Sequence, residues 1–154
     1  MKWTLALFVF FLGIAPAIAS NWISIGTSSA NSRYYLDTDS VRSGSQFSLK
    51  YIVAWIKVDS TLNKTASVNM GGKANIRRHI AESKILYHIQ CDEHKMRIAS
   101  YVDYDASGAV LASRNFDFAG AFNPVVPESV GELILDRVCE YAGLSFTPSS
   151  PEKM

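Results

Sequence analysis

Residues 47–58 read FSLKYIVAWIKV and form the most regularly patterned segment of the chain. Successive side chains of a β-strand point to opposite faces of a sheet, so the residues of a strand sort into two alternating sets. Here the two sets are Leu49, Tyr51, Val53 and Trp55 on one face and Ile52, Ala54, Ile56 and Val58 on the other. Because both sets are apolar, we expect both faces of this strand to be covered, as in the centre of a sheet.

Shorter segments with strand patterns lie on both sides of this stretch. We expect strands over residues 22–26, 33–37, 80–91, 95–104 and 109–118. Residues 105–108, Asp-Ala-Ser-Gly, are typical of a hairpin turn between the last two strands. Residues 38–46 are rich in turn residues and are expected to form a connection. Residues 59–75 show no period and are expected to form either a long loop or a short helix followed by a loop.

One helix is predicted near the C-terminus. Ser129 and Glu132 match a capping box, in which a hydroxyl and a carboxylate three residues apart accept hydrogen bonds from backbone N–H groups. Apolar residues then follow at helical spacing: Val130, Ile134, Val138 and Tyr141. Gly143 suits the position after the helix, where a left-handed backbone is common. This order of elements predicts an α+β fold, an antiparallel sheet of about six strands with one C-terminal helix packed on it.

Residues 1–19 have the layout of a secretory signal peptide. Lys2 supplies a positive charge, residues 5–15 form an uncharged apolar run, and Ala17-Ile18-Ala19 places small residues ahead of Ser20. The apolar run is too short to span a bilayer, which takes roughly 20 residues. We therefore expect cleavage after Ala19 and export. Because a serine rather than a cysteine follows the small residues, we expect no lipid anchor.

The chain that remains after cleavage has the length of one domain. We expect a single domain over residues 20–143 and a flexible tail over residues 144–154, with no transmembrane segment. The full chain has 15 basic and 14 acidic residues, and the leader removes Lys2, so the mature chain is formally neutral. A neutral chain has no overall field that favours nucleic acid or an anionic membrane.

Cys91 and Cys139 are the only cysteines in the sequence. In an oxidising compartment two cysteines favour a disulfide, within the chain or between two chains. Within the chain it would close a loop of about 49 residues, a crosslink worth roughly 4 kcal/mol in the chain-entropy model. It would join the strand that ends at Cys91 to the predicted helix.

Two histidines, His88 and His94, lie three residues to either side of Cys91, a spacing that resembles a metal site. On a strand, however, Cys91 and His88 point to opposite faces. The sequence also has no Cys-x-x-Cys pair. We therefore favour the disulfide and expect neither a metal nor a cofactor.

Short motifs in a fixed order between residues 83 and 139 point to a family. They are Ser83-Lys84, Cys91, Lys95, Arg97, Tyr104, Gly108, Pro127-Glu128-Ser129, Glu132 and Val138-Cys139, with Trp22 and residues 34–37 fitting the opening strands. On these residues the chain resembles the surface-adhesin protein E-like family of bacterial extracytoplasmic domains. The resemblance implies an antiparallel sheet with a C-terminal helix held by the disulfide. It also implies an adhesin role, because named members of that family bind host matrix or serum proteins.

Basic residues are concentrated between positions 73 and 97, where six Lys and Arg residues stand against three acidic ones. The candidate ligand-binding set is Lys73, Arg77, Arg78, Lys84, His88, Lys95 and Arg97. Pairing of the two strands in this region would place the last four on the sheet face opposite the helix, with Tyr101 nearby. Such a face suits an acidic protein or a sulfated glycan. The alternative is an ordinary solvated sheet face.

No motif in the sequence points to catalysis. The chain has no Gly-x-Ser-x-Gly nucleophile elbow, although His79, His88 and His94 leave an acid–base pair open. We expect a non-enzymatic extracytoplasmic binding module, periplasmic or at the outer surface, that takes a protein or acidic glycan ligand through the basic strand face. The alternative is a periplasmic structural or envelope-associated protein without a host ligand.

Overall fold

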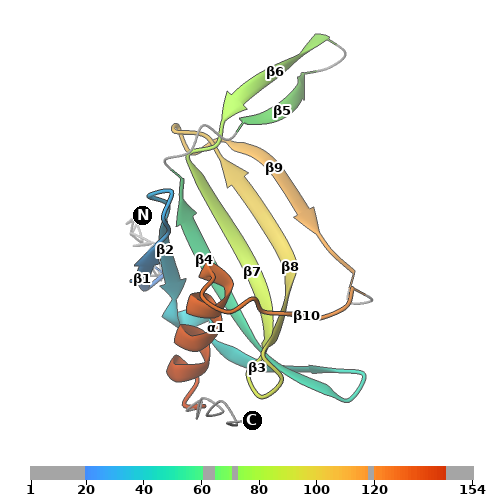
Figure 1. Cartoon of the computed structure of the whole chain (residues 1–154). Helices are drawn as coiled ribbons and strands as arrows, with labels where there is room; N and C mark the ends of the chain where they lie inside the picture. Colours follow the sequence, from blue (N-terminus) through green and yellow to red (C-terminus); the bar gives the residue numbers. More distant parts are fainter. Residues whose placement is uncertain (1–19, 61–64, 71–72, 118–119, 145–154) are drawn as a thin grey trace, which may run out of the picture.

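A computed structural model describes residues 20–60, 65–70, 73–117 and 120–144 (Figure 1). The predicted leader lies outside the described residues, and so does the predicted tail after Leu144. The elements in chain order are β1 (Trp22–Thr27), β2 (Arg33–Asp37), the 3-10 turn η1 (Thr38–Ser40), β3 (Arg42–Gln46), β4 (Leu49–Asp59), β5 (Thr65–Met70), β6 (Lys73–His79), β7 (Glu82–Gln90), β8 (Lys95–Tyr104), β9 (Val110–Asn115), β10 (Asn123–Pro124) and α1 (Val130–Tyr141).

The strands form one large antiparallel sheet and one small one. The large sheet has eight strands in the order β1-β2-β4-β7-β8-β10, with β3 beside β4 and β9 beside β8 (Figure 1). The small sheet is the hairpin β5–β6, which projects from one end of the large sheet. The predicted α+β class, antiparallel sheet and C-terminal helix are confirmed, with more strands than the sequence indicated.

The central position of β4 follows from its apolar alternation. β2 and β3 pair with successive halves of one edge of β4, and β7 pairs along the other edge. On one face, Ile52, Ala54 and Ile56 are buried against α1, and the core is completed by Ile134, Leu135, Val138 and Cys139. On the other face Val53 is buried as well. Both faces of β4 are therefore covered in part, as predicted.

The ends of α1 are set by the local contacts that the sequence indicated. The Ser129 hydroxyl accepts a hydrogen bond from the backbone N–H of Glu132, at 3.3 Å. The Glu132 carboxylate accepts in return from the N–H of Glu128, at 2.6 Å, one residue earlier than in an ideal capping box. At the other end Gly143 has φ +73, and the N–H of Leu144 donates to the carbonyl of Cys139. This is a Schellman motif.

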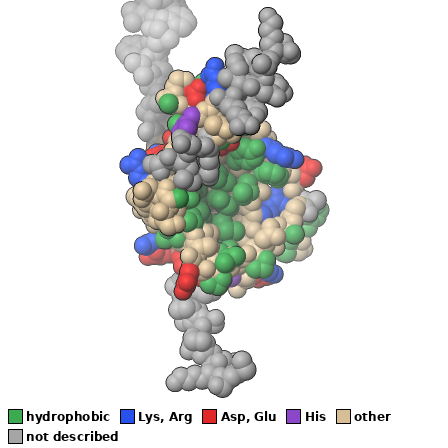
Figure 2. All heavy atoms as spheres, turned by 45° about the horizontal axis from the view of Figure 1, so that its top comes forward, with side chains coloured by type: hydrophobic (Ala, Val, Ile, Leu, Met, Phe, Trp, Pro, Cys, Tyr) green, Lys and Arg blue, Asp and Glu red, His purple; other side chains and the backbone are tan. Residues whose placement is uncertain are grey.

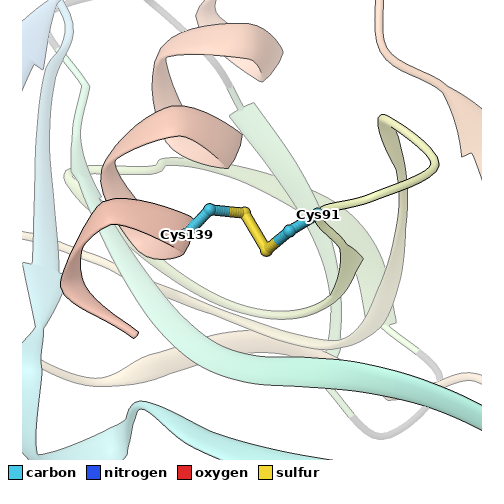
Figure 3. Close-up of a disulfide and its surroundings, with 2 residues drawn as sticks. All are labelled: Cys91 and Cys139. Carbon is cyan, nitrogen blue, oxygen red and sulfur yellow. A yellow bond between two sulfur atoms is a disulfide. The ribbon is translucent and has the colours of Figure 1, made fainter. Parts of the chain in front are cut away.

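A disulfide ties α1 to the sheet (Figure 3). Cys91 directly follows β7, Cys139 lies on α1, and their Cα atoms are 5.8 Å apart. Both residues are buried in the main hydrophobic core. The pairing is within the chain and spans 48 positions. The predicted disulfide is confirmed, and with it the attachment of the helix to the strand that ends at Cys91.

The expectation that residues 38–46 form only a connection is wrong, because η1 and β3 lie there. β3 and β4 form a hairpin whose two loop residues, Phe47 and Ser48, have φ +49 and +66. Positive φ at both loop residues is the requirement of a type I′ turn, which Asn-Gly usually meets. Since Phe-Ser is an unusual pair for this turn, the hairpin could not be recognised from the sequence, and β4 begins at Leu49 rather than Phe47.

The expected long loop, or short helix and loop, over residues 59–75 is also wrong. β4 continues to Asp59, and the hairpin β5–β6 occupies most of the positions after it. In this hairpin Val68 pairs with Ile76, and the remaining pairs consist mostly of polar or small residues. This hairpin projects from the large sheet and contributes no residue to the described core, and its sequence lacks the apolar alternation from which strands are predicted.

A β-bulge in β8 changes which residues share a face. Leu86 pairs with Ser100 while the next residue of β7, Tyr87, pairs with Ile98, so Ala99 is the extra residue. Beyond the bulge the alternation is reversed. Tyr101 therefore lies on the α1 side of the sheet, opposite Ile85, and not beside the basic residues as expected.

The helix covers only part of its sheet face. α1 packs across β1 and β4, and Ile98 on β8 remains 42% exposed. In Figure 2, hydrophobic side chains gather at the centre of the visible surface and charged side chains lie toward its rim. The exposed basic side chains of the sheet therefore lie away from this apolar region.

Candidate functional site

We define the open face as the face of the eight-stranded sheet opposite α1. Strand register places side chains on it in rows that run across the strands. One row crosses β2, β4 and β7 through Tyr35, Lys57 and Lys84. A second crosses β7 and β8 through His88 and Arg97. The candidate residues Lys84, His88 and Arg97 thus share this face, as the alternation predicted.

Arg97 is buried rather than presented to solvent. Only 5% of the residue is exposed. Its guanidinium donates hydrogen bonds to the carbonyls of Gly120, at 3.0 Å, and Phe116, at 3.4 Å. Arg97 therefore holds the segment that follows β9 against the open face, which is a structural role.

His88 lies beside Arg97 and is neutral at physiological pH. Its imidazole stacks on the ring of Tyr51, with centroids 4.3 Å apart. Burial, together with the positive charges of Arg97 and Arg42, lowers the pKa of His88 from 6.5 to about 4. His88 thus contributes an aromatic surface here and no charge.

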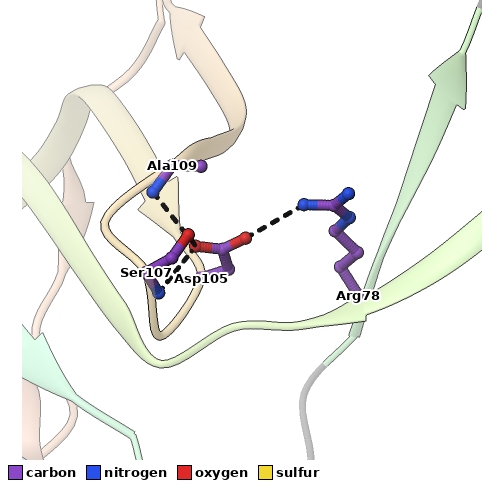
Figure 4. A network of polar contacts seen from close by, with 4 residues as sticks. All are labelled: Arg78, Asp105, Ser107 and Ala109. Atoms are coloured by element: carbon purple, nitrogen blue, oxygen red, sulfur yellow. Dashed lines mark hydrogen bonds and ion pairs between the residues drawn. The ribbon is translucent and has the colours of Figure 1, made fainter.

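Three further candidates lie away from the centre of the open face. Arg78, on β6, forms an ion pair of 3.1 Å with Asp105 in the β8–β9 turn (Figure 4). Hydrogen bonds from the Ser107 hydroxyl and from the backbone of Ala109 lower the pKa of Asp105, so this carboxyl stays ionised. The side chains of the other two, Lys73 and Arg77, lie outside the described part of β6.

Lys95 lies at the start of β8, at the opposite end of the sheet from Lys84. Its ammonium group forms an ion pair of 2.6 Å with Glu93. The side chain is 37% exposed. Glu93 therefore neutralises the charge of Lys95, and Lys95 lies far from the row of residues that contains Lys84.

Lys84 and Lys57 lie together among aromatic rings. The ammonium group of Lys84 lies 5.2 Å from the centre of the Tyr104 ring and 5.9 Å from that of Trp22. The ammonium group of Lys57 lies 4.4 Å from the Tyr35 ring and 5.6 Å from the same Trp22 ring. We call these five residues the lysine–aromatic cluster.

Lys57 was not among the candidates predicted from sequence. It continues the alternating set of the open face in β4 and stands directly opposite Lys84 in the β4–β7 register. The break in an otherwise apolar alternation was the available signal. This break could be interpreted only by knowing that β7 places a second lysine opposite Lys57.

Two opposing interactions act in the lysine–aromatic cluster: the two ammonium groups repel each other, and the aromatic rings attract both of them. Like charges directly opposite on neighbouring strands are destabilising. Cation–π contacts at exposed sites contribute about 0.5–1 kcal/mol each. Lys84 also has a carboxylate partner, Glu82, at 3.5 Å. Within the described ranges no carboxylate forms an ion pair with Lys57, so aromatic rings alone hold this cation.

A hollow of about 920 Å³ lies at the other end of the molecule, beside the disulfide. Ile52 and Ile89 of the sheet, Cys91 and the residues after α1 contribute to its lining. Lys50 and Asp92 are the charged side chains of that lining. Among the described residues, no group of His, Cys, Asp and Glu is placed to hold a metal ion, in the hollow or elsewhere.

Comparison with known families bears on this arrangement. The family model named Surface-adhesin protein E matches residues 22–140, from the first strand to the disulfide-bonded helix. The chain belongs to the surface-adhesin protein E family. This family suggests a surface adhesin, exported or displayed at the surface, and a non-enzymatic protein. No curated protein and no solved structure matches the chain.

Two further findings concern localisation and chemistry in this member of the surface-adhesin protein E family. No helix in the described residues is long and apolar enough to cross a membrane. The three histidines that left acid–base chemistry open lie in three different parts of the fold. His79 ends β6, His88 lies on β7 among cations, and His94 lies in the β7–β8 turn with φ +51.

Proposed function

We propose that this chain is a non-enzymatic extracytoplasmic binding module that attaches to acidic ligands of the host matrix through the open face of its sheet. Family membership supports the adhesin role. The observation that carries the choice of surface is the lysine–aromatic cluster, in which Lys57 and Lys84 stand side by side on aromatic rings. Matrix proteins and acidic glycans both present the negative charge that such a surface attracts.

The other residues of the predicted basic set differ in how much exposed positive charge they add to this surface. Arg97 is buried and His88 is neutral, so both shape the face but offer no exposed charge. Lys84 and Lys95 are exposed, and Arg78 is exposed on the neighbouring hairpin. The proposal therefore rests on Lys84 and its neighbour Lys57, with Arg78 extending the positive charge beyond the sheet; it does not rest on Lys95, which is neutralised by Glu93.

The first experiment asks where the protein is and whether it binds. Intact cells that produce the full chain are treated with a membrane-impermeant amine label, and the purified protein is tested on immobilised matrix glycoproteins and heparin. We expect labelling on intact cells and binding that weakens as salt rises, since salt screens exposed charges. A protein labelled only after the cells are opened, and without matrix or heparin binding, would favour the periplasmic structural alternative and reject the proposal.

The second experiment asks whether positive charge is responsible. The combined variant Arg78→Gln and Lys84→Gln removes two exposed cations while Lys95 and Arg97 stay in place. We expect weaker binding to the matrix or heparin surface, with an unchanged melting temperature because exposed ion pairs contribute only about 0–1 kcal/mol. Binding equal to that of the parent protein would exclude the basic surface as the attachment site.

A further inference from the structure

Lys57 is a positive charge for which the fold supplies aromatic contacts but no ionic partner within the described ranges. Its neighbour Lys84 is directly opposite, and both ammonium groups lie over the Trp22 ring. Bringing these two cations together costs free energy in the isolated protein. An anion placed between them would remove that repulsion, so this pair is arranged to favour a negatively charged group.

The aromatic rings also hold the two cations in position. A free lysine side chain loses about 2 kcal/mol of rotamer entropy when a ligand fixes it. Here the rings of Tyr35, Trp22 and Tyr104 already restrict both lysines through cation–π contacts. Preorganisation of this kind lowers the entropic cost of binding.

The residue types suit a compact anion such as a sulfate group. Arginine binds carboxylates and phosphates with two parallel hydrogen bonds, whereas lysine acts as a compact point charge that fits any small anion. The nearby arginine, Arg33, is already paired with Asp59 at 3.4 Å. The cluster therefore offers point charges to its ligand, which suits the tetrahedral sulfate group.

The rings favour a sugar as the carrier of that sulfate. Trp22, Tyr35 and Tyr104 are each half-buried, so part of every ring remains accessible. Tyrosine and tryptophan, which combine an apolar ring with a polar group that reaches water, are common at binding interfaces. A pyranose ring has an apolar C–H face that stacks on such a ring while its sulfates reach neighbouring cations.

From these observations we infer that the lysine–aromatic cluster is a subsite for a sulfated sugar, with Lys57 and Lys84 binding the sulfate and the aromatic rings contacting the sugar. The inference rests on the proposed function and names its ligand class. Glu82, whose side chain is 32% exposed, lies 3.5 Å from Lys84 and competes with the incoming anion. Its removal should therefore strengthen binding.

The test measures the affinity of the purified protein for a short heparin-derived oligosaccharide and for its chemically desulfated form. We expect the parent protein to prefer the sulfated form. Lys57→Gln and Lys84→Gln should each weaken binding about tenfold, the value of one hydrogen bond to a charged group. Glu82→Gln should strengthen it, an outcome that general damage to the fold cannot produce.

Lys95→Gln is the matched control. Lys95 is as exposed as Lys84, at 37%, and is likewise paired with a glutamate, but it lies at the other end of the sheet. Its substitution should change the affinity less than twofold, and melting temperatures should confirm that every variant is folded. Equal losses in Lys95→Gln and Lys84→Gln, or equal binding of the desulfated sugar, would overturn the inference.

The outcomes also separate this inference from the proposed function. A parent protein that binds matrix glycoproteins but not the sulfated sugar would overturn the subsite and leave the adhesin role standing. A parent protein that binds neither would reject both. Binding of the sugar that survives loss of both Lys57 and Lys84 would place the ligand elsewhere on the protein.

Discussion

Lys57 is the residue at which a regular apolar pattern is interrupted. β4 alternates apolar residues on its open face through Val53 and Trp55, and the next position of that set is a lysine. The alternation predicted the strand and its central place correctly. It did not predict the lysine–aromatic cluster, because Trp22 and Tyr104 come from strands far apart in the sequence.

His88 is the residue for which the structure predicts a pH dependence. Its pKa is about 4 in the folded protein against 6.5 when exposed, so the unfolded chain binds the proton more tightly. The free energy of unfolding should therefore be greatest above pH 6.5 and should fall as the pH drops toward 4. Urea unfolding between pH 7 and pH 5 measures this slope.

The variant His88→Gln provides the control for that measurement. Glutamine keeps a polar side chain beside Tyr51 but does not titrate. The stability of the variant should change less with pH than that of the parent over the same interval. Identical slopes for the two proteins would mean that burial and the charges of Arg97 and Arg42 do not hold His88 neutral.

At the scale of the element, the sequence predicted where several strands lie. It did not predict the features that depend on unusual backbone conformations. The bounds of β2 and β8 were predicted to the residue, because polar, turn-rich segments border both strands. The β3–β4 turn uses Phe47 and Ser48 at positive φ, and β8 carries a bulge at Ala99. Neither feature leaves a mark in composition or period, so the faces beyond them could not be assigned.

The N-cap of α1 gives a prediction at this scale. Ser129→Ala removes the hydroxyl that accepts from the N–H of Glu132. We expect the free energy of unfolding to fall by about 1 kcal/mol, the usual value of an N-cap hydroxyl. Chemical denaturation measures the loss. Ser113→Ala, at an exposed strand position, should change stability by less than about 0.5 kcal/mol, and a similar loss in both variants would contradict a capping role.

At the scale of the whole molecule, the two ends of the open face differ. The segment after β9 covers one end, where Arg97 holds the carbonyls of Phe116 and Gly120. The other end carries the lysine–aromatic cluster. The sequence predicted a basic face from charge alone. It could not show that Arg97 would be buried, that His88 would be neutral or that Arg78 would pair with Asp105, since these depend on tertiary contacts.

The disulfide gives the prediction for the molecule as a unit. Cys91 and Cys139 close a loop of 48 positions between the sheet and α1. Reduction should lower the free energy of unfolding by about 4 kcal/mol, within the usual range for loops of this length. The melting temperatures of the oxidised and reduced protein measure the effect. Equal melting temperatures, or free thiols in the exported protein, would contradict the stabilising role.

The central claim is that an acidic ligand binds the open face at the lysine–aromatic cluster. Chemical-shift mapping of the isotope-labelled protein during titration with a sulfated oligosaccharide tests this claim most directly. The account predicts shifts concentrated around Trp22, Lys57 and Lys84, on three different strands. Shifts concentrated on α1 or around the hollow beside the disulfide would contradict it.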